Sequence, residues 1–192
     1  MDPVTLQLWS VIGTWVASIG TVSAVITSLW MAYHQGRVKL DVVAGCRQLI
    51  TQGSSDIPDY CMIKVVNIGN RPAKIVSVSW EAGRLNNKKH LIQMFGLRGF
   101  DDVPKMLQEG EEATFMIPFH LNGDKKDWLI SFPQYLAEDD PKIISSLKVV
   151  VHTSVGQSFK VKAEQGLIDK LKESLEANKS SLQDTSGASA SD

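Results

Sequence analysis

A long uncharged segment near the N-terminus constrains the fold of this chain more than any other feature. No Asp, Glu, Lys or Arg occurs from Pro3 to Gly36, whereas charged residues make up 21% of the whole 192-residue chain. A helix needs about 20 consecutive, mainly apolar residues to cross the core of a bilayer. The segment therefore predicts one transmembrane helix, over about residues 8–33.

Aromatic side chains delimit the predicted span. Trp9 lies near its start, and Trp30 and Tyr33 lie near its end, as expected at the two membrane interfaces. At about 1.5 Å per residue, a helix from Trp9 to Trp30 is about 31 Å long, which matches a bilayer core of about 30 Å. A cleaved signal peptide would begin with a basic region, and a soluble helix of this length would show a charged face. The segment has neither feature.

Small residues recur along the predicted helix and would let a second helix approach closely. The candidate helix-association residues are Ser10, Gly13, Thr14, Ala17, Thr21, Ala24 and Ser28. Because packing drives helix association inside lipid, this stripe favours a homo-oligomer or contact with a partner's membrane helix. The alternative is that these residue types are simply common in membrane helices.

Charges beside the helix predict its orientation. Only Asp2 precedes it, whereas Arg37 and Lys39 follow it closely. Basic residues are retained on the cytoplasmic side, so we expect a single-pass protein of the cytoplasmic (inner) membrane with its C-terminal domain inside. Arg37 and Lys39 join Trp9, Trp30 and Tyr33 as candidate membrane-interface residues. Only one or two residues separate the helix from the next predicted element, which would keep the domain close to the membrane surface.

Two cysteines, Cys46 and Cys61, are too few for a disulfide framework. In a cytoplasmic domain both would be free thiols, most simply facing the core. In an exported domain a bridge between neighbouring strands would become feasible. The spacing of the two residues does not decide between these alternatives.

Beyond Gly36 the apolar pattern takes the period of two that is typical of strands. Strands are predicted over residues 38–47, 60–66, 75–80, 90–95, 114–119, 147–152 and 158–161. The third should place Val76, Val78 and Trp80 on one face. We expect a loop over residues 99–110 and a short helix within 124–136, capped by Asp124 and interrupted by Pro133. About seven short strands without long helices between them predict an antiparallel sandwich or barrel.

The order of several local patterns resembles the immunoglobulin-like β-sandwich of small bacterial single-pass membrane-anchored proteins. These patterns are VNIG at 66–69 followed by PAKI at 72–75, EGE at 109–111, and the closing hairpin VHTSVGQSF at 151–159. The resemblance covers residues 38–163. It implies a mainly β fold that binds ligands on loops or sheet edges, and it brings over no catalytic residue. The Cys–Trp–Cys order of antibody domains is absent, because Trp80 follows both cysteines.

Apolar residues at helical spacing follow the predicted sandwich. Ile168, Leu171, Leu175 and Leu182 predict an amphipathic helix that either folds back on the domain or meets a partner helix. The Ser-, Ala- and Gly-rich end is expected to be disordered. The predicted organisation is an N-terminal segment over 1–36, a β-sandwich domain over 37–163, a helix over 164–182 and a tail over 183–192.

No residue pattern predicts a catalytic, cofactor-binding or metal site. The four histidines, His34, His90, His120 and His152, lack ligand spacing. Cys46 paired with a remote histidine would suit a cysteine protease, but a cysteine on a strand face is usually part of the core. The net charge of −1 gives no support for nucleic-acid binding.

Two functions remain as hypotheses. The first is a non-enzymatic binding or adaptor module that recruits or senses a protein partner at the membrane, through residues 99–110 or a sheet edge. The second is an effector whose helices oligomerise and perturb the bilayer under control of the β-sandwich. Membrane leakage that disappears when the Ser/Thr row of the helix is changed to Leu would favour the effector.

Overall fold

The computed structural model divides the chain into two compact units, residues Met1–Arg37 and Val38–Asp192. It describes residues 3–35, 37–50, 58–84, 87–96, 100–120, 127–138 and 140–188. The first unit contains a single helix, α1 (Pro3–Gln35). Within it, residues Gln7–Tyr33 are long and apolar enough to cross a membrane. The predicted N-terminal apolar helix is thus present.

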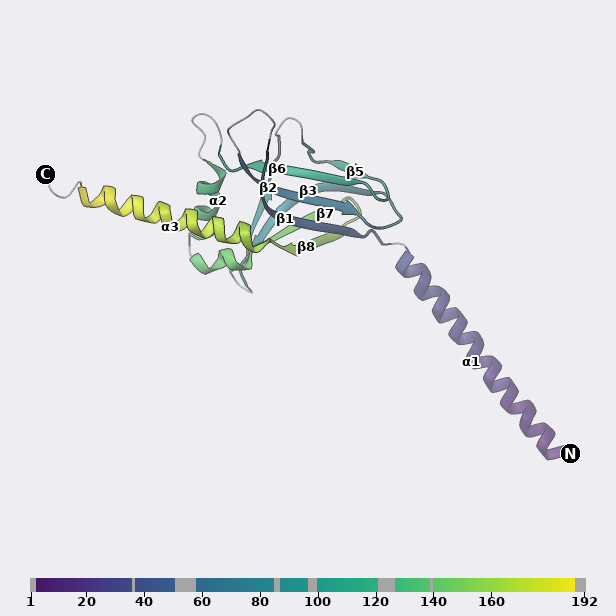
Figure 1. Cartoon of the computed structure of the whole chain (residues 1–192). Coiled ribbons are helices and arrows are strands. Elements are labelled where there is room, and N and C mark those ends of the chain that lie inside the picture. The colour runs from purple at the N-terminus through teal and green to yellow at the C-terminus, as the bar shows by residue number, and fades with distance from the viewer. Residues whose placement is uncertain are drawn as a thin grey trace. The chain divides into compact units, whose positions relative to one another are not determined.

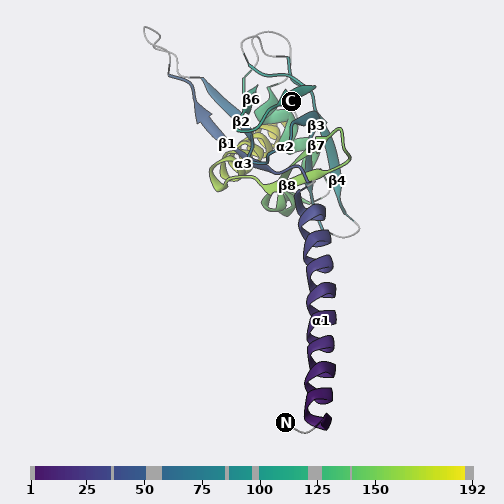
Figure 2. The same ribbon diagram turned by 90° about the vertical axis from the view of Figure 1, so that its right-hand side faces the viewer.

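The second unit contains two antiparallel sheets (Figures 1 and 2). The first sheet has the order β1-β2-β6 and consists of β1 (Leu40–Gln48), β2 (Asp59–Asn67) and β6 (Glu112–Pro118). The second has the order β4-β3-β7-β8 and consists of β3 (Ala73–Ala82), β4 (Lys89–Gln93), β7 (Lys148–Thr153) and β8 (Ser158–Lys162). A short strand, β5 (Lys105–Leu107), also pairs with β3.

Both sheets contribute to one hydrophobic core. Ile63 and Phe115 from the first sheet and Val78 and Val149 from the second belong to the same buried cluster. On and just after β6, Phe115, Ile117 and Phe119 face inward, since all three are buried. Among the described residues, strands are about as common as helices, so the mainly β expectation was too strong. The two terminal helices, of 33 and 24 residues, contribute most of the helical residues.

The predicted face of β3 was partly wrong. Val78 and Trp80 are buried, but Val76 is 40% exposed and Ile75 is fully buried. The register between β3 and β7 shifts between Ile75 and Ser77. Such an irregularity inserts one extra residue and reverses the alternation of side chains on its two sides. Val76 therefore points away from the face that Val78 occupies.

A short helix, α2 (Trp128–Leu136), lies where a helix was expected, with Asp127 at its N-cap. The expected cap, Asp124, lies outside the described residues. Pro133 lies inside α2 without ending it. The ring of Trp128 stacks on those of Phe119 at 5.8 Å and Phe132 at 4.5 Å, and lies 6.1 Å from Trp80. This aromatic cluster joins α2 to strands of both sheets.

Two short elements were missed in the sequence. The predicted loop over residues 99–110 contains β5, a short strand that pairs with β3. A 3-10 helix, η1 (Pro141–Ser146), precedes β7, and the Asp140 carboxylate accepts a hydrogen bond from the Lys142 backbone N–H at 2.9 Å. Neither element has enough residues to show a period. The predicted β7–β8 hairpin is present, and its turn uses Gly156 at φ 77°.

The C-terminal helix, α3 (Gln165–Ala188), packs on the domain through its first turns. Leu167, Ile168, Leu171 and Leu175 are buried in the core, so the fold-back alternative is the one observed. The helix also continues past residue 182, and residues 184–188, expected to be disordered, are helical. Extending an existing helix costs far less than nucleating one, and no proline interrupts this stretch. Residues 189–192 lie outside the described residues.

Candidate functional site

The predicted helix-association residues all lie exposed on α1. They are Ser10, Gly13, Thr14, Ala17, Thr21, Ala24 and Ser28. Several of the hydroxyl groups on α1 donate to the carbonyl four residues earlier, for example Thr14 to Ser10 at 2.9 Å and Thr21 to Ala17 at 2.9 Å. Ser18, Thr27 and Ser28 do the same. These hydroxyl protons are therefore satisfied within the helix and are not directed toward a polar lining.

The candidate membrane-interface residues do not form one cluster. Trp9, Trp30 and Tyr33 are exposed on α1. Arg37 lies 4.5 Å above the Tyr33 ring and donates a hydrogen bond to its hydroxyl. Lys39 belongs to the second unit, where its carbonyl accepts from the Ile68 N–H at 3.0 Å. The structure thus brings Arg37 and Tyr33 into contact.

The described histidines lie in three separate surroundings. His90 Nδ1 is 3.8 Å from Glu81, His120 Nδ1 is 2.8 Å from Asp127, and His152 bridges Ser79 and Ser158 at 3.0 and 2.9 Å. Among the described residues, no group of three His, Cys, Asp or Glu side chains is placed to hold a metal ion. The ring nitrogens of His120 and His152 serve local hydrogen bonds.

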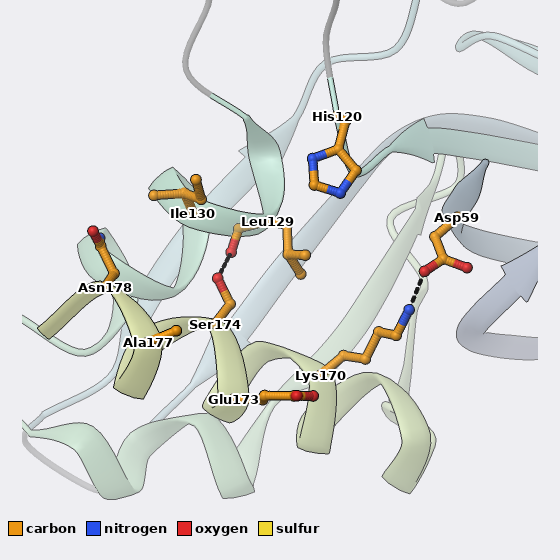
Figure 3. A pocket seen from close by; sticks show the side chains of 9 residues that line it. All are labelled: Asp59, His120, Leu129, Ile130, Lys170, Glu173, Ser174, Ala177 and Asn178. Carbon is orange, nitrogen blue, oxygen red and sulfur yellow. Dashed lines mark hydrogen bonds and ion pairs between the residues drawn. The ribbon is translucent and has the colours of Figure 1, made fainter. Parts of the chain in front are cut away.

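A cavity of about 520 Å³ is the best candidate for a binding site in the second unit (Figure 3). It is bounded by the start of β2, the residues after β6, and the helices α2 and α3. The lining residues are Asp59, His120, Leu129, Ile130, Lys170, Glu173, Ser174, Ala177 and Asn178. A volume of this size lies within the range of ligand pockets, about 300–1,000 Å³.

Backbone hydrogen bonds hold the cavity's strands and α2 together. The Phe119 N–H donates to the Asp59 carbonyl at 3.2 Å, which continues the β2–β6 ladder to the cavity edge. The Leu129 N–H then donates to the Phe119 carbonyl at 3.3 Å and fixes the start of α2 beside β6. The position of His120 follows from this arrangement, because it directly succeeds Phe119.

An ion pair closes one end of the cavity. Lys170 extends from α3 toward Asp59 and donates to its carboxylate (Figure 3). The hydrogen bond from Lys170 lowers the pKa of Asp59, although burial acts in the opposite direction. The same bond raises the pKa of Lys170. The ammonium group also lies 5.7 Å from the Phe119 ring. This end of the cavity therefore carries a fixed pair of opposite charges.

A side-chain bond repairs the hydrogen-bond pattern of α2. Pro133 has no N–H to donate to the Leu129 carbonyl, four residues earlier. The Ser174 hydroxyl of α3 donates to that carbonyl at 2.8 Å instead (Figure 3). Ser174 thus joins the two helices that form the walls of the cavity, and its proton is already engaged.

The rest of the cavity wall combines the apolar Leu129, Ile130 and Ala177 with His120, Asn178 and one acid, Glu173. Ile130 is 39% exposed, Ala177 is exposed, and Glu173 is exposed beside them on α3. This combination suits an apolar group that carries a hydrogen-bond donor or a positive charge. The hydrogen-bonded Ser79, His152 and Ser158 do not line it. The described cavity lining thus suits binding better than nucleophilic chemistry.

The cavity lies elsewhere than the loop that the sequence favoured for binding. Residues 100–110 are held in place: Asp101 accepts from the Thr114 N–H at 2.8 Å and pairs with Lys105 at 2.8 Å, and β5 pairs with β3. No sequence motif includes Asp59, Lys170 or Ser174. Their contacts join segments that are distant in sequence, so no local pattern identifies them.

No protein-family model and no curated protein matches this chain. Among solved structures, it is similar to Northeast Structural Genomics Consortium target SoR45, at 14% identity over 68% of this chain and 89% of that chain, with a TM-score of 0.30. It is also similar to the Bordetella pertussis protein that is target BeR40 of the same consortium, at 16% identity over 66% and 89%, with a TM-score of 0.29. At these TM-scores neither likeness bears on the function.

Proposed function

We propose that this chain is a membrane-anchored, non-enzymatic binding module. One observation carries the proposal: from Gln7 to Tyr33 a 27-residue apolar helix exposes every one of its described side chains. A second compact unit carries the cavity, and a bilayer supplies the cover that α1 lacks.

The free energy gained by burying α1 in lipid is large. Fifteen bulky apolar residues of α1 are exposed, among them Trp15, Ile19 and Val22. Leaving such a side chain in water instead of burying it costs about 1.5–3 kcal/mol, so the whole helix would cost on the order of tens of kcal/mol. Since its backbone groups bond within the helix and several hydroxyls do too, α1 is suited to hydrocarbon. This supports a single membrane span.

We further propose that the span crosses the cytoplasmic membrane with the second unit in the cytoplasm. Arg37 and Lys39 directly follow the helix, and basic residues beside a span favour its cytoplasmic side. Association of α1 into homo-oligomers is part of the same proposal. It rests on the small residues along the helix, which permit close packing.

In this proposal the second unit is an immunoglobulin-like β-sandwich that presents the cavity to a protein partner. The two sheets share one buried cluster, which supports face-to-face packing. The partner places an apolar side chain against Ile130 and Ala177, and a basic group near Glu173. Because Lys170 and Asp59 neutralise each other, Glu173 supplies the unbalanced charge at this wall.

Site-specific photo-crosslinking tests the binding site. A photoreactive amino acid is placed at Ile130 or Ala177 of the full chain in membranes, and the crosslinked product is identified by mass spectrometry. The same residue at Val155, which is 65% exposed and does not line the cavity, is the matched control. We expect one protein to be captured from the two cavity positions and not from Val155.

A binding measurement then separates true partners from neighbours. The captured protein, once purified, should bind the full chain, and Ala177→Arg should weaken binding at least about 10-fold, because it fills the cavity and repels a basic group. Equal capture from Val155, or unchanged affinity of the Ala177→Arg variant, would remove the cavity from the proposal.

A further inference from the structure

Cys46 and Cys61 lie directly opposite each other on neighbouring strands. They are partners in the antiparallel register of β1 and β2, which runs without interruption from Leu40↔Asn67 to Gln48↔Asp59. Both are free thiols. The two strands lie side by side in both views of the molecule (Figures 1 and 2). Whether the two sulfur atoms can meet depends on the type of pair.

The hydrogen bonds just beyond this ladder define the type of pair. The Leu49 N–H donates to the Pro58 carbonyl at 3.2 Å, and the Ile68 N–H donates to the Lys39 carbonyl at 3.0 Å. Both bonds join residues that are opposite each other when the register is extended by one step. Hydrogen-bonded and non-hydrogen-bonded pairs alternate along an antiparallel ladder. Odd-numbered positions of β1 are therefore hydrogen-bonded, and Cys46 belongs to a non-hydrogen-bonded pair.

The opposite edge of β2 leads to the same assignment. The Asp59 carbonyl accepts from Phe119 on the β6 side at 3.2 Å, so odd-numbered residues of β2 direct their backbone groups away from β1. Cys61 shares this orientation. In a non-hydrogen-bonded pair the Cα atoms are about 4.5 Å apart and the side chains are closest. A disulfide needs a Cα separation of about 4.4–6.8 Å, so the pair can be bridged in its observed register.

The two thiols differ in access. Cys61 is fully buried, whereas Cys46 is partly exposed. Burial raises the pKa of both, far more for Cys61, while the positive charge of Lys170 lowers the pKa of Cys46. Asp59 and Glu164 raise the pKa of Cys46 and Arg47 lowers it, so the pKa of this thiol stays above its ordinary value but is raised less than that of Cys61. Cys46 is thus the thiol that a dissolved reagent can reach and the one more readily converted to a thiolate.

We propose that Cys46 and Cys61 form a reversible cross-strand disulfide by exchange with a small-molecule disulfide of the oxidised-glutathione class. The Cys46 thiolate attacks one sulfur of the reagent, which forms a mixed disulfide and releases one thiolate. Cys61 gives its proton to solvent or to that thiolate and attacks the Cys46 sulfur, which releases the second thiolate. Two protein thiols are oxidised and one disulfide is reduced to two thiols.

The geometry also favours reversal. Cys46 is partly exposed, and an exposed disulfide is easier to reduce than a buried one. The two cysteines would therefore be oxidised or reduced according to the ratio of oxidised to reduced glutathione around the second unit, and would not form a permanent structural disulfide. Lys170 and Asp59, the ion pair at the end of the cavity, also act electrostatically on the Cys46 thiol.

Glutathione titration of the full chain in detergent tests the proposal. The protein is equilibrated in buffers of increasing oxidised-to-reduced glutathione ratio, quenched with acid, alkylated under denaturing conditions and analysed by intact mass. We expect a species that has lost two hydrogens and takes up no alkylating reagent, and that returns to two alkylated thiols in reduced glutathione. Peptide mapping should join Cys46 to Cys61.

The single variants Cys46→Ala and Cys61→Ala are matched controls. Cys61→Ala should accumulate glutathione on Cys46, and Cys46→Ala should leave Cys61 at least about 10-fold less modified, because it is buried. Circular dichroism of each variant checks that it is folded. Two free thiols at every ratio, a mixed disulfide that never closes, or a bond only between two chains would each overturn the proposal.

Discussion

Gly45 on β1 leaves room for a charged side chain from the start of α3. A Cβ atom at this position would lie 2.0 Å from Glu164 Oε2 and 2.7 Å from an Arg47 guanidinium nitrogen. Arg47 and Glu164 form a two-bonded ion pair at 2.7 and 2.8 Å across this gap. The Glu164 N–H donates to the Ala44 carbonyl at 2.8 Å. The absence of a side chain at Gly45 thus lets α3 begin directly on β1.

A double-mutant cycle tests this role of Gly45. We expect Gly45→Ala to lower the free energy of unfolding by about 0.5–1 kcal/mol more in the wild-type background than in the Glu164→Ala background. The difference is small because both ion-pair partners are about 40% exposed and solvent screens them. Urea unfolding of the four proteins gives the coupling free energy. The same cost in both backgrounds would show that Glu164 does not explain the glycine.

Glu81 is a nearly buried carboxylate among cations. Its side chain is 7% exposed and lies 2.5 Å from Lys160, 3.6 Å from Lys88 and 3.8 Å from His90. The hydrogen bond from Lys160 lowers its pKa, and burial opposes this effect. A carboxyl group whose pKa is lower in the folded than in the unfolded state stabilises the fold at pH values above its unfolded pKa, which is about 4.3 for Glu. That contribution is lost as the pH falls through the folded pKa.

Glu81→Gln should therefore destabilise the protein by about 1 kcal/mol at neutral pH, a modest value because the lysines are half exposed and screened. The difference in unfolding free energy between wild type and variant should shrink as the pH falls below about 4. Chemical denaturation at a series of pH values measures it. A difference that stays constant down to the acid limit would contradict a role for the carboxylate charge.

At the scale of elements, Ser174 compensates for a proline in the neighbouring helix. Ser174→Ala should leave the Leu129 carbonyl without its donor and cost about 1 kcal/mol of unfolding free energy. In a Pro133→Ala background an N–H is restored at the position that normally serves that carbonyl. We expect the cost of Ser174→Ala to fall by at least about half there. Equal costs in the two backgrounds would mean that Ser174 acts through another contact.

Helices and strands were predicted correctly from the sequence where an apolar segment was long enough to show a recognisable pattern. The helix α1 was predicted from its long uncharged segment and the strands β1, β2, β6 and β7 from their apolar residues, and the structure contains all five. β5 is too short to show such a pattern, and the irregularity between Ile75 and Ser77 depends on pairing with β7, which is distant in sequence. The end of α3 was placed too early because a Ser-, Ala- and Gly-rich composition was taken as a sign of disorder.

At the scale of the whole molecule, the candidate site could not have been predicted. Lys170 and Asp59 are 111 residues apart, and Ser174 and Leu129 are 45 apart. Each pair meets only because the first turns of α3 bury Leu167, Ile168 and Leu171 in the core shared by both sheets. A charge or a serine carries no local sign of such a partner. The predicted loop site, in contrast, rested on local turn residues alone.

Each of the two units has one role in the proposed function: the apolar helix inserts into lipid, and the compact second unit binds a partner. Lipid insertion of α1 is the central claim, because orientation, association and partner recruitment all depend on it. Two acids at the middle of the helix, Ile19→Asp with Val22→Asp, should oppose insertion by roughly 5–7 kcal/mol. Tyr33→Lys, at the end of the span, is the matched control and should be tolerated.

Membrane fractionation after an alkaline carbonate wash is the most direct measurement. We predict that the wild-type chain and the Tyr33→Lys variant stay in the membrane pellet, and that the Ile19→Asp, Val22→Asp variant and a fragment of residues 38–192 are released. Recovery of the wild-type chain in the wash, or retention of the doubly acidic variant to the same extent as wild type, would contradict the account.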